Sequence, residues 1–382
     1  MSAAFILASI ALGAWIYLLG FRGMFWRLRE RDDLGNPVPD PSAWPSVVAV
    51  VPARDEAELI EQSAGSLLAQ DYPGGFRIFL IDDQSTDNTA ALAEAQNRDG
   101  RLIVLRGTGR PSGWTGKLWA LKQGIVHAAG ERLPDYFWFT DADIIHTKDN
   151  LRRLVARAEH DNLVMVTLMA KLRCESLAER FLIPAFVFFF QMLFPFSWVN
   201  RRGSPVAAAA GGCMLVGRGA LERAGGIDSV RQEIIDDCAL ARRMKAQGPI
   251  WLGLTERAVS LRRYERLRDI RQMVSRSAYA QLRYSPALLA ATIAGMVALY
   301  VAPVLIAMFG AGAARMEAAL CWLCMAVAFQ PILAFYRRMP LWGLALPLIG
   351  LFYAAFTVHS AVQHKRGLGG MWKGRAQAMT GR

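Results

Sequence analysis

The sequence is poor in the residues that build metal-thiolate sites and disulfide scaffolds. Among its 382 residues there are only 5 cysteines, and those in the polar part do not have the spacing of a metal site. Cys321 and Cys324 form a C-x-x-C pair, but they lie in an apolar segment with no histidine nearby. We therefore interpret the cysteines as small buried hydrophobic residues, and nothing in their pattern indicates an oxidised secreted scaffold.

The sequence also has fewer acidic than basic residues. Lysine and arginine number 44 against 32 aspartates and glutamates, which gives a formal net charge of +12. Such a balance is typical of proteins that meet nucleic acid, an anionic membrane surface or an anionic small substrate. Because the sequence has no clustered basic arm and no nucleic-acid-binding motif, we predict no nucleic-acid partner.

The first residues of the chain carry almost no charge. Residues 3–19 are uncharged, and Arg22, Arg27, Arg29 and Arg31 follow them closely. A cleaved signal peptide carries its positive charge before the apolar stretch, so we predict an uncleaved transmembrane anchor at residues 1–21. The arginines behind it predict that the following polar region is cytoplasmic.

The last quarter of the chain is apolar again. Three stretches, residues 287–308, 318–335 and 341–362, predict C-terminal membrane helices within 286–363, followed by a basic tail at 364–382. We expect a multi-pass protein of the cell inner (cytoplasmic) membrane. The number of spans stays open, because three spans after a cytoplasmic domain would put the basic tail outside, against the positive-inside rule.

One apolar stretch, residues 181–199, lies inside the polar region. Pro184 and Pro195 interrupt it, which argues against a spanning helix. A buried core helix and a helix on the bilayer surface are both open interpretations.

Between Pro45 and about Met169, apolar runs alternate with helical patterns. The runs predict strands at residues 46–51, 76–81, 101–105 and 136–139, with helices between them. This alternation indicates βαβ units, and so an α/β domain with a Rossmann-like, mostly parallel central sheet, which we place at residues 45–285. In such sheets, ligands bind beyond the carboxyl ends of the strands.

Acidic residues gather where the predicted strands end. They are Asp55 and Glu56, Asp82 and Asp83, and Asp141 and Asp143. Neighbouring carboxylates repel unless a cation joins them, so Asp141 and Asp143 can share a hard divalent metal, Mg²⁺ or Mn²⁺, that leaves ligand positions for phosphate. The alternative is a helix cap, because D-x-D alone is a weak signal.

A loop before a predicted helix adds a positive charge. In GWTGKLWAL, residues 113–121, two glycines precede Lys117. Exposed backbone N–H groups and one cation suit a diphosphate. The loop is not a P-loop, because the G-x-x-x-x-G-K-[ST] spacing is absent.

Two further segments follow later in the polar region. In EIIDDCAL, Asp236 and Asp237 stand in the first turn of a predicted helix, where either dipole stabilisation or a catalytic base explains them. Gln281 and Arg283 come just before the C-terminal membrane segments. Arg283 either reaches lipid headgroups or meets the phosphates of a substrate.

In this order, the stretches resemble a membrane-anchored family 2 glycosyltransferase with the GT-A fold. VVPARDE resembles the opening strand and acidic turn, LIDDQSTDNT the nucleotide motif, DAD the D-x-D metal motif, and IIDDCAL the segment that carries the base. GWTGK, AAAAGGCMLVGR and WKGR look most like the bacterial hopene-associated glycosyltransferases. Two departures are Asp236, where the family more often has Glu, and the absence of the Q-x-x-R-W motif of processive synthases.

The resemblance implies an inverting, metal-dependent and non-processive transfer from a nucleotide-sugar donor to a membrane lipid such as a hopanoid. Asp143, with Asp141 nearby, would hold Mg²⁺ or Mn²⁺, and Asp237, with Asp236 beside it, would be the base. The donor would be bound by Pro52, Asp55, Glu56, Asp82, Asp83, Lys117, Asp141, Gln281 and Arg283. Three alternatives are a processive polysaccharide synthase of the same family, a sugar nucleotidyltransferase, and a membrane-bound binding protein without activity.

Overall fold

The protein consists of two compact units of different composition. The computed structural model describes residues 2–34, 38–131, 133–372 and 375–376. One unit, the helical unit, takes the chain up to Arg29 together with Cys174–Ser197 and Tyr264–Gly370. The other, the α/β unit, takes Glu30–Arg173, Trp198–Arg263 and the end of the chain. Residues 174–197 and 264–285, which we had assigned from sequence to the catalytic domain, therefore lie in the helical unit.

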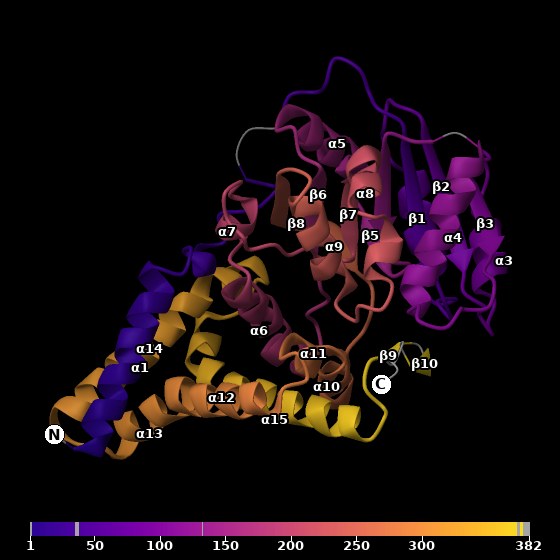
Figure 1. Cartoon of the computed structure of the whole chain (residues 1–382). Coiled ribbons are helices and arrows are strands. Elements are labelled where there is room, and N and C mark those ends of the chain that lie inside the picture. The colour runs from indigo at the N-terminus through magenta and orange to yellow at the C-terminus, as the bar shows by residue number, and fades with distance from the viewer. Residues whose placement is uncertain (1, 35–37, 132, 373–374, 377–382) are drawn as a thin grey trace. The chain divides into compact units, whose positions relative to one another are not determined.

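A large sheet forms the centre of the α/β unit (Figure 1). Within the described residues it has eight strands in the order β3-β2-β1-β4-β7-β6-β8-β5. The first four in this order run parallel to one another: β1 (Val47–Ala53), β2 (Phe76–Asp82), β3 (Leu102–Arg106) and β4 (Tyr136–Thr140). The other half is mixed: β5 (Ile144–His146), β6 (Met165–Lys171), β7 (Cys213–Gly217) and β8 (Ile250–Ser260). The predicted α/β fold with a mostly parallel central sheet is confirmed.

The central strands are apolar because helices cover both faces of the sheet. All seven residues of β1 are buried, which is the pattern of a parallel strand inside a doubly covered sheet. The helices of this unit are α2 (Ile60–Leu68), α3 (Thr89–Glu94), α4 (Gly116–Glu131), α5 (Asn150–His160), α8 (Arg218–Arg223) and α9 (Asp236–Lys245). A short helix, α7 (Phe196–Asn200), lies where the chain passes from one unit to the other, and β9 (Met371–Trp372) pairs with β10 (Arg375–Ala376) near the end.

Helix α4 packs directly on β1 and β2 (Figure 1). The approach is close because Gly124 faces the sheet: a Cβ there would lie 2.4 Å from Val50 Cγ1 and 3.2 Å from Ile81 Cδ1. The glycine thus sets the distance between α4 and the sheet, and α4 carries Lys117 in its first turn.

We expect Gly124→Ala to lower the stability of the α/β unit by about 1–3 kcal/mol, because the added methyl overpacks the helix–sheet contact. Alanine favours helix by about 1 kcal/mol over glycine, so the loss comes from the contact and not from helix propensity. Gly130→Ala is the control, since a Cβ at Gly130 of the same helix would meet no described atom within 4 Å. Thermal unfolding of the detergent-purified protein would contradict the expectation if both variants kept the parent midpoint.

Within the described residues of the helical unit, four helical segments are long and apolar enough to cross a membrane. They are α1 (Ala3–Gly20), Pro286–Phe309, α14 (Gly312–Phe335) and Pro340–Lys365. The segment Pro286–Phe309 consists of α12 (Pro286–Met296), a π turn at Val297–Val301 and α13 (Ala302–Phe309). The segment Pro340–Lys365 consists of a 3₁₀ turn at Pro340–Ala345 and α15 (Leu346–Lys365). Helix α1 lies along α14 (Figure 1). At about 1.5 Å per residue, these segments match a hydrocarbon core about 30 Å thick.

The apolar stretch with two prolines forms helix α6 (Leu177–Leu193) of the helical unit, and Pro184 lies inside the helix. Its start is fixed by Glu179, a fully buried residue whose carboxylate accepts the N–H groups of Ser176 at 2.8 Å and Tyr264 at 2.7 Å. Phe188 of α6 packs against Phe329 of α14 with ring centroids 5.3 Å apart. These contacts agree with the buried-helix interpretation. The remaining helices of this unit are α10 (Leu267–Ser275) and α11 (Ala278–Gln281).

Candidate functional site

The functional candidates of the α/β unit converge at the carboxyl ends of its parallel strands. Lys117 Nζ, in the first turn of α4, lies 2.5 Å from Oδ1 of Asp141, which directly follows β4. Burial alone would lower the pKa of Lys117, but Asp141, and then Asp236 and Asp237, outweigh it, so the pKa is raised. The ammonium group is therefore a permanent positive charge shared by three carboxylates.

Asp237 is held in place at the start of α9. Its Oδ2 accepts the backbone N–H of Gly211 at 2.9 Å, and its Oδ1 accepts the N–H of Cys238 at 2.7 Å. A Cβ at Gly211 would lie 3.1 Å from Lys117 Nζ and 3.4 Å from Asp237 Oδ2, so both side chains lie against this glycine. Its lack of a side chain lets a cation and a carboxylate approach the same point of backbone.

The environment of Asp237 is suited to proton transfer near neutral pH. Removal from water, and then repulsion from Asp236, raise the pKa of Asp237 to about 6, although Lys117 and the two N–H groups act in the opposite direction. A carboxylate with a pKa near the working pH is an efficient general base. The position of Asp236 and Asp237 in the first turn of α9 also fits dipole stabilisation, and their role as a catalytic base stays a prediction.

Each carboxylate of the D-x-D motif lies beside a different cationic side chain. Asp141 contacts Lys117, whereas Asp143 Oδ2 accepts a hydrogen bond of 2.8 Å from Arg262 Nε. The pKa of Asp141 is raised, chiefly by burial and further by Asp143, even though Lys117 opposes both. The negative charge of Asp143 thus disfavours ionisation of Asp141, and added positive charge beside Asp141 would stabilise its carboxylate form.

This donor set fits Mg²⁺ or Mn²⁺. Such ions commonly bind one or two protein carboxylates and take their other ligands from water and substrate phosphates. Within the described residues, no third acidic, histidine or cysteine side chain completes a protein-only metal site. Asp143 and Asp141 would therefore hold a divalent cation only in part, with oxygen atoms of a bound diphosphate as the expected remaining ligands.

The acidic residues at the ends of β1 and β2 shape the loop formed by the LIDDQSTDNT stretch. Asp55, with a left-handed φ of +49°, accepts the N–H of Thr86 at 2.7 Å, and Asp82 accepts the N–H of Ser85 at 3.3 Å. Asp83 is fully buried. The turn-forming role expected for such residues is present, and their contact with a base or ribose stays a prediction.

The other predicted donor-binding residues lie in three different environments. Pro52 lies inside β1, paired with Ile81 of β2. Glu56 directs Oε1 toward Arg262 Nη2 at 2.5 Å. Gln281, at the end of α11, and Arg283 belong to the helical unit and are exposed there. A role of Gln281 and Arg283 in donor binding stays a prediction.

Sequence reasoning missed Arg262 and Gly211. Arg262 follows β8 and comes 119 residues after Asp143 in the chain, in a basic run that also contains Arg263 and Arg266. Nothing in the local sequence distinguishes it from these neighbours. Gly211 belongs to the AAAAGGCMLVGR stretch, where the double glycine was the only available signal.

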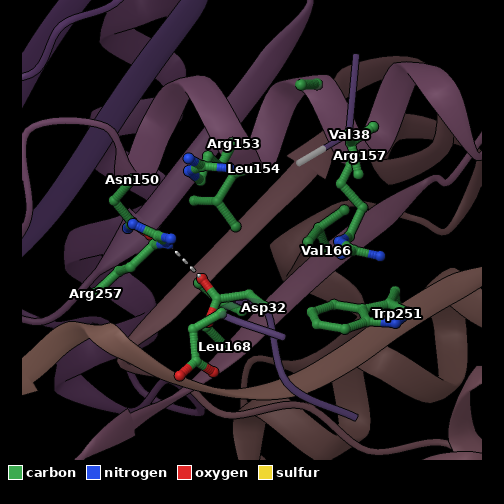
Figure 2. Close-up of a pocket in the computed structure, with 12 residues that line it drawn as sticks. Asp32, Val38, Asn150, Arg153, Leu154, Arg157, Val166, Leu168, Trp251 and Arg257 are labelled. Atoms are coloured by element: carbon green, nitrogen blue, oxygen red, sulfur yellow. Dashed lines mark ion pairs between the residues drawn. The ribbon is translucent and has the colours of Figure 1, made fainter. Parts of the chain in front are cut away.

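A cavity of about 120 Å³ lies elsewhere in the α/β unit, beside α5, β6 and β8 (Figure 2). Arg257 spans part of it, with Nε 3.2 Å from Asp32 Oδ2 and Nη1 2.7 Å from Asp149 Oδ2. Burial raises the pKa of Asp32 in spite of Arg257. The cavity has room for several water molecules, and its described lining does not include Asp141, Asp143, Lys117 or Asp237. We interpret it as a hydrated part of the core.

Comparison with known proteins agrees with the glycosyltransferase resemblance of the motifs. Residues 48–225, a little under half of the chain, match the family described as Glycosyl transferase family 2. The matched residues include β1 to β7 of the α/β unit and helix α6 of the helical unit. Over this range the chain is similar to a family 2 glycosyltransferase domain.

Two particular proteins are similar to this chain. A stretch of 115 residues, 29% of the chain, is 33% identical to a beta-monoglucosyldiacylglycerol synthase of Synechocystis sp., of whose length the match covers only 22%. The solved structure of the mannosyltransferase PcManGT from Pyrobaculum calidifontis, in complex with GDP-Man and Mn²⁺, has a TM-score of 0.56 at 21% identity, covering 95% of this chain and 98% of that one. The second likeness shows a shared fold.

Proposed function

We propose that the protein is an inverting, metal-dependent, non-processive glycosyltransferase that moves a sugar from a nucleotide-sugar donor to a membrane lipid, with hopanoids as the first acceptors to test. The observation that carries the proposal is that Lys117, paired with Asp141, meets Asp237 at Gly211. A cation suited to a diphosphate thus lies next to a separate carboxylate of pKa about 6. The similarity to a protein named for a glycosylated diacylglycerol supports a lipid acceptor.

In this mechanism the residues have distinct tasks. Asp143 and Asp141 would hold Mg²⁺ or Mn²⁺, which when bound neutralises the leaving diphosphate. Lys117 adds a fixed positive charge on the same side. Asp237, oriented by the N–H of Gly211, takes the proton from the acceptor hydroxyl as its oxygen attacks the anomeric carbon. One displacement from the face opposite the diphosphate inverts the anomeric centre.

The membrane arrangement is part of the proposal. The four helices of spanning length support an integral, multi-pass protein, and the arginines that follow α1 favour a cytoplasmic α/β unit at the inner membrane. A lipid acceptor would then be available in the same membrane. The predicted basic tail at 364–382 lies partly outside the described residues.

The test uses membranes that contain the full chain. They are incubated with a panel of radiolabelled nucleotide sugars, with hopanoid or other lipid acceptors, and with or without Mn²⁺ or Mg²⁺. Metal-dependent label in the organic phase, as a product with a single added sugar, supports the proposal. Long sugar chains would instead indicate the processive synthase, and no transfer and no metal-dependent donor hydrolysis with any donor would reject the enzyme assignment.

The raised pKa of Asp237 predicts the pH dependence of transfer. The base must be deprotonated, so kcat/KM should be constant above about pH 7 and fall about tenfold per pH unit below the pKa of about 6. Asp236 and Lys117 face this carboxylate and set its pKa in opposite directions. Asp236→Asn should therefore move the fall to lower pH. A profile that stays flat between pH 5 and pH 8 in both proteins would contradict the assignment.

A further inference from the structure

Arg262 lies at the candidate metal site without belonging to any motif. The backbone fixes its position, because β8 ends at Ser260, paired with Ile144 of β5, and the N–H of Leu261 donates to the carbonyl oxygen of Asp143 at 2.8 Å. The guanidinium then reaches Asp143 Oδ2 at 2.8 Å and Glu56 Oε1 at 2.5 Å. The side chain of Arg262 is 33% exposed, whereas those of Asp143 and Glu56 are only 12% and 9% exposed.

This contact conflicts with metal binding by the same carboxylate. Arginine keeps its charge at all accessible pH values, so it cannot make way for a cation by losing a proton. A divalent ion at Asp143 either displaces the guanidinium from Oδ2, which breaks a charge-assisted hydrogen bond, or binds Oδ1 beside a second positive charge. Arg262 disfavours the ion in both arrangements. Without donor, Lys117 and Arg262 already compensate Asp141 and Asp143, and this lowers the attraction of the site for a free ion.

A diphosphate changes this balance. It brings additional negative charge, and its oxygen atoms can bind both a divalent ion and a guanidinium fork. The side chain of Arg262 is more exposed than those of Asp143 and Glu56, and Arg262 follows the end of β8. Its side chain can therefore turn away from Asp143 without loss of sheet hydrogen bonds.

We infer that Arg262 is a built-in counter-cation that competes with the divalent metal for Asp143, so that the metal binds tightly only together with a nucleoside diphosphate group, which receives the displaced guanidinium. The inference rests on the proposed function, since it takes Asp143 as the metal ligand. It also assigns Glu56 a different task from the predicted donor contact: Glu56 holds Arg262 in its donor-free position. Metal and diphosphate would then strengthen each other's binding by the same factor.

The test measures Mn²⁺ binding to the detergent-purified full chain, by titration calorimetry and by the spin-resonance signal of free Mn²⁺, so it does not depend on transfer. Mn²⁺ is added alone and with UDP or GDP. The proteins compared are the parent, Arg262→Gln, Arg262→Lys, and Arg263→Gln as the control at the adjacent exposed arginine. A double variant, Arg262→Gln with Asp143→Asn, shows whether any change arises at Asp143.

For Mn²⁺ alone, Arg262→Gln should bind at least about tenfold more tightly than the parent, the value expected when one charge-assisted hydrogen bond no longer has to be broken. Arg262→Lys, which keeps the charge but cannot form the fork, should fall between them, and Arg263→Gln should match the parent. The double variant should lose the gain. The enhancement of Mn²⁺ binding by UDP or GDP should shrink in Arg262→Gln.

Three results would overturn the inference. Unchanged or weaker binding of Mn²⁺ alone by Arg262→Gln, while the parent binds Mn²⁺ with a diphosphate, rejects the competition and leaves the proposed function standing. A gain that persists in the double variant places the competing site elsewhere. Absence of Mn²⁺ binding in every variant, even with diphosphate, rejects both the inference and the metal dependence of the proposed reaction.

Discussion

Asp237→Asn is expected to lower the rate of sugar transfer about 10²–10⁴-fold, the usual contribution of a general base, while donor and metal still bind. The reason is that asparagine has nearly the shape of aspartate and can still accept the N–H of Gly211 through its amide oxygen, but cannot take up a proton. The loss should appear in kcat, with little change in the KM for the nucleotide sugar.

The measurement is a single-turnover transfer assay, with donor binding followed separately by calorimetry. Asp99→Asn is the control: it makes the same change at an exposed carboxylate of the α/β unit and should retain the parent transfer rate at pH 7. Near-normal turnover of Asp237→Asn, or an equal loss in both variants, would show that Asp237 is not the base.

Asp143→Asn should reduce metal-dependent transfer by about 10²-fold or more, because charge stabilisation by a bound metal contributes several kcal/mol in enzymes of this kind. The amide keeps the size of the side chain but is a poor ligand for a hard divalent ion. The loss should be partly recovered at high Mn²⁺ concentration, since Asp141 would still be available as a ligand.

The effect is measured as transfer rate against Mn²⁺ concentration, together with the thermal shift produced by Mn²⁺ and a nucleoside diphosphate. Asp99→Asn is a suitable control, because this exposed aspartate pairs only locally with Arg101 in the contacts described for it. Full metal-dependent activity of Asp143→Asn at low Mn²⁺ would remove this residue from the metal site.

The parallel half of the sheet could be predicted from sequence because its signals are local. Each of the first four strands is a short apolar run followed by polar or turn-forming residues, and the run at residues 46–51 corresponds to the fully buried β1. The mixed half could not be predicted in the same way. Strand β7 lies between β4 and β6 although it follows both in sequence, and this order depends on long-range pairing that leaves no periodic pattern.

The helical unit shows the same limit. The apolar character of residues 181–199 was evident, but not that α6 packs with α14 and α15 of a distant part of the chain. A domain assigned as one continuous range, 45–285, could not represent this return of the chain to the helical unit. Composition indicates that a segment will be buried, and only the fold determines what buries it.

In the candidate site too, residues within local motifs could be predicted from sequence, and a residue that depends on long-range contacts could not. Asp141, Asp237 and Lys117 could be proposed from ordered motifs at strand and helix ends, and the structure brings them together, although their chemical roles remain predictions. Arg262 could not be found, because its significance comes from its contacts with Asp143 and Glu56, both far away in the chain.

Under the proposed function, the four helices of membrane-spanning length have a kinetic consequence. An enzyme and a lipid acceptor that share one bilayer meet by lateral diffusion in two dimensions, while the soluble donor arrives from three. The relevant acceptor concentration is then its mole fraction in the membrane. Dilution with inert lipid therefore lowers the acceptor concentration that the enzyme meets. Dilution with buffer leaves this concentration unchanged.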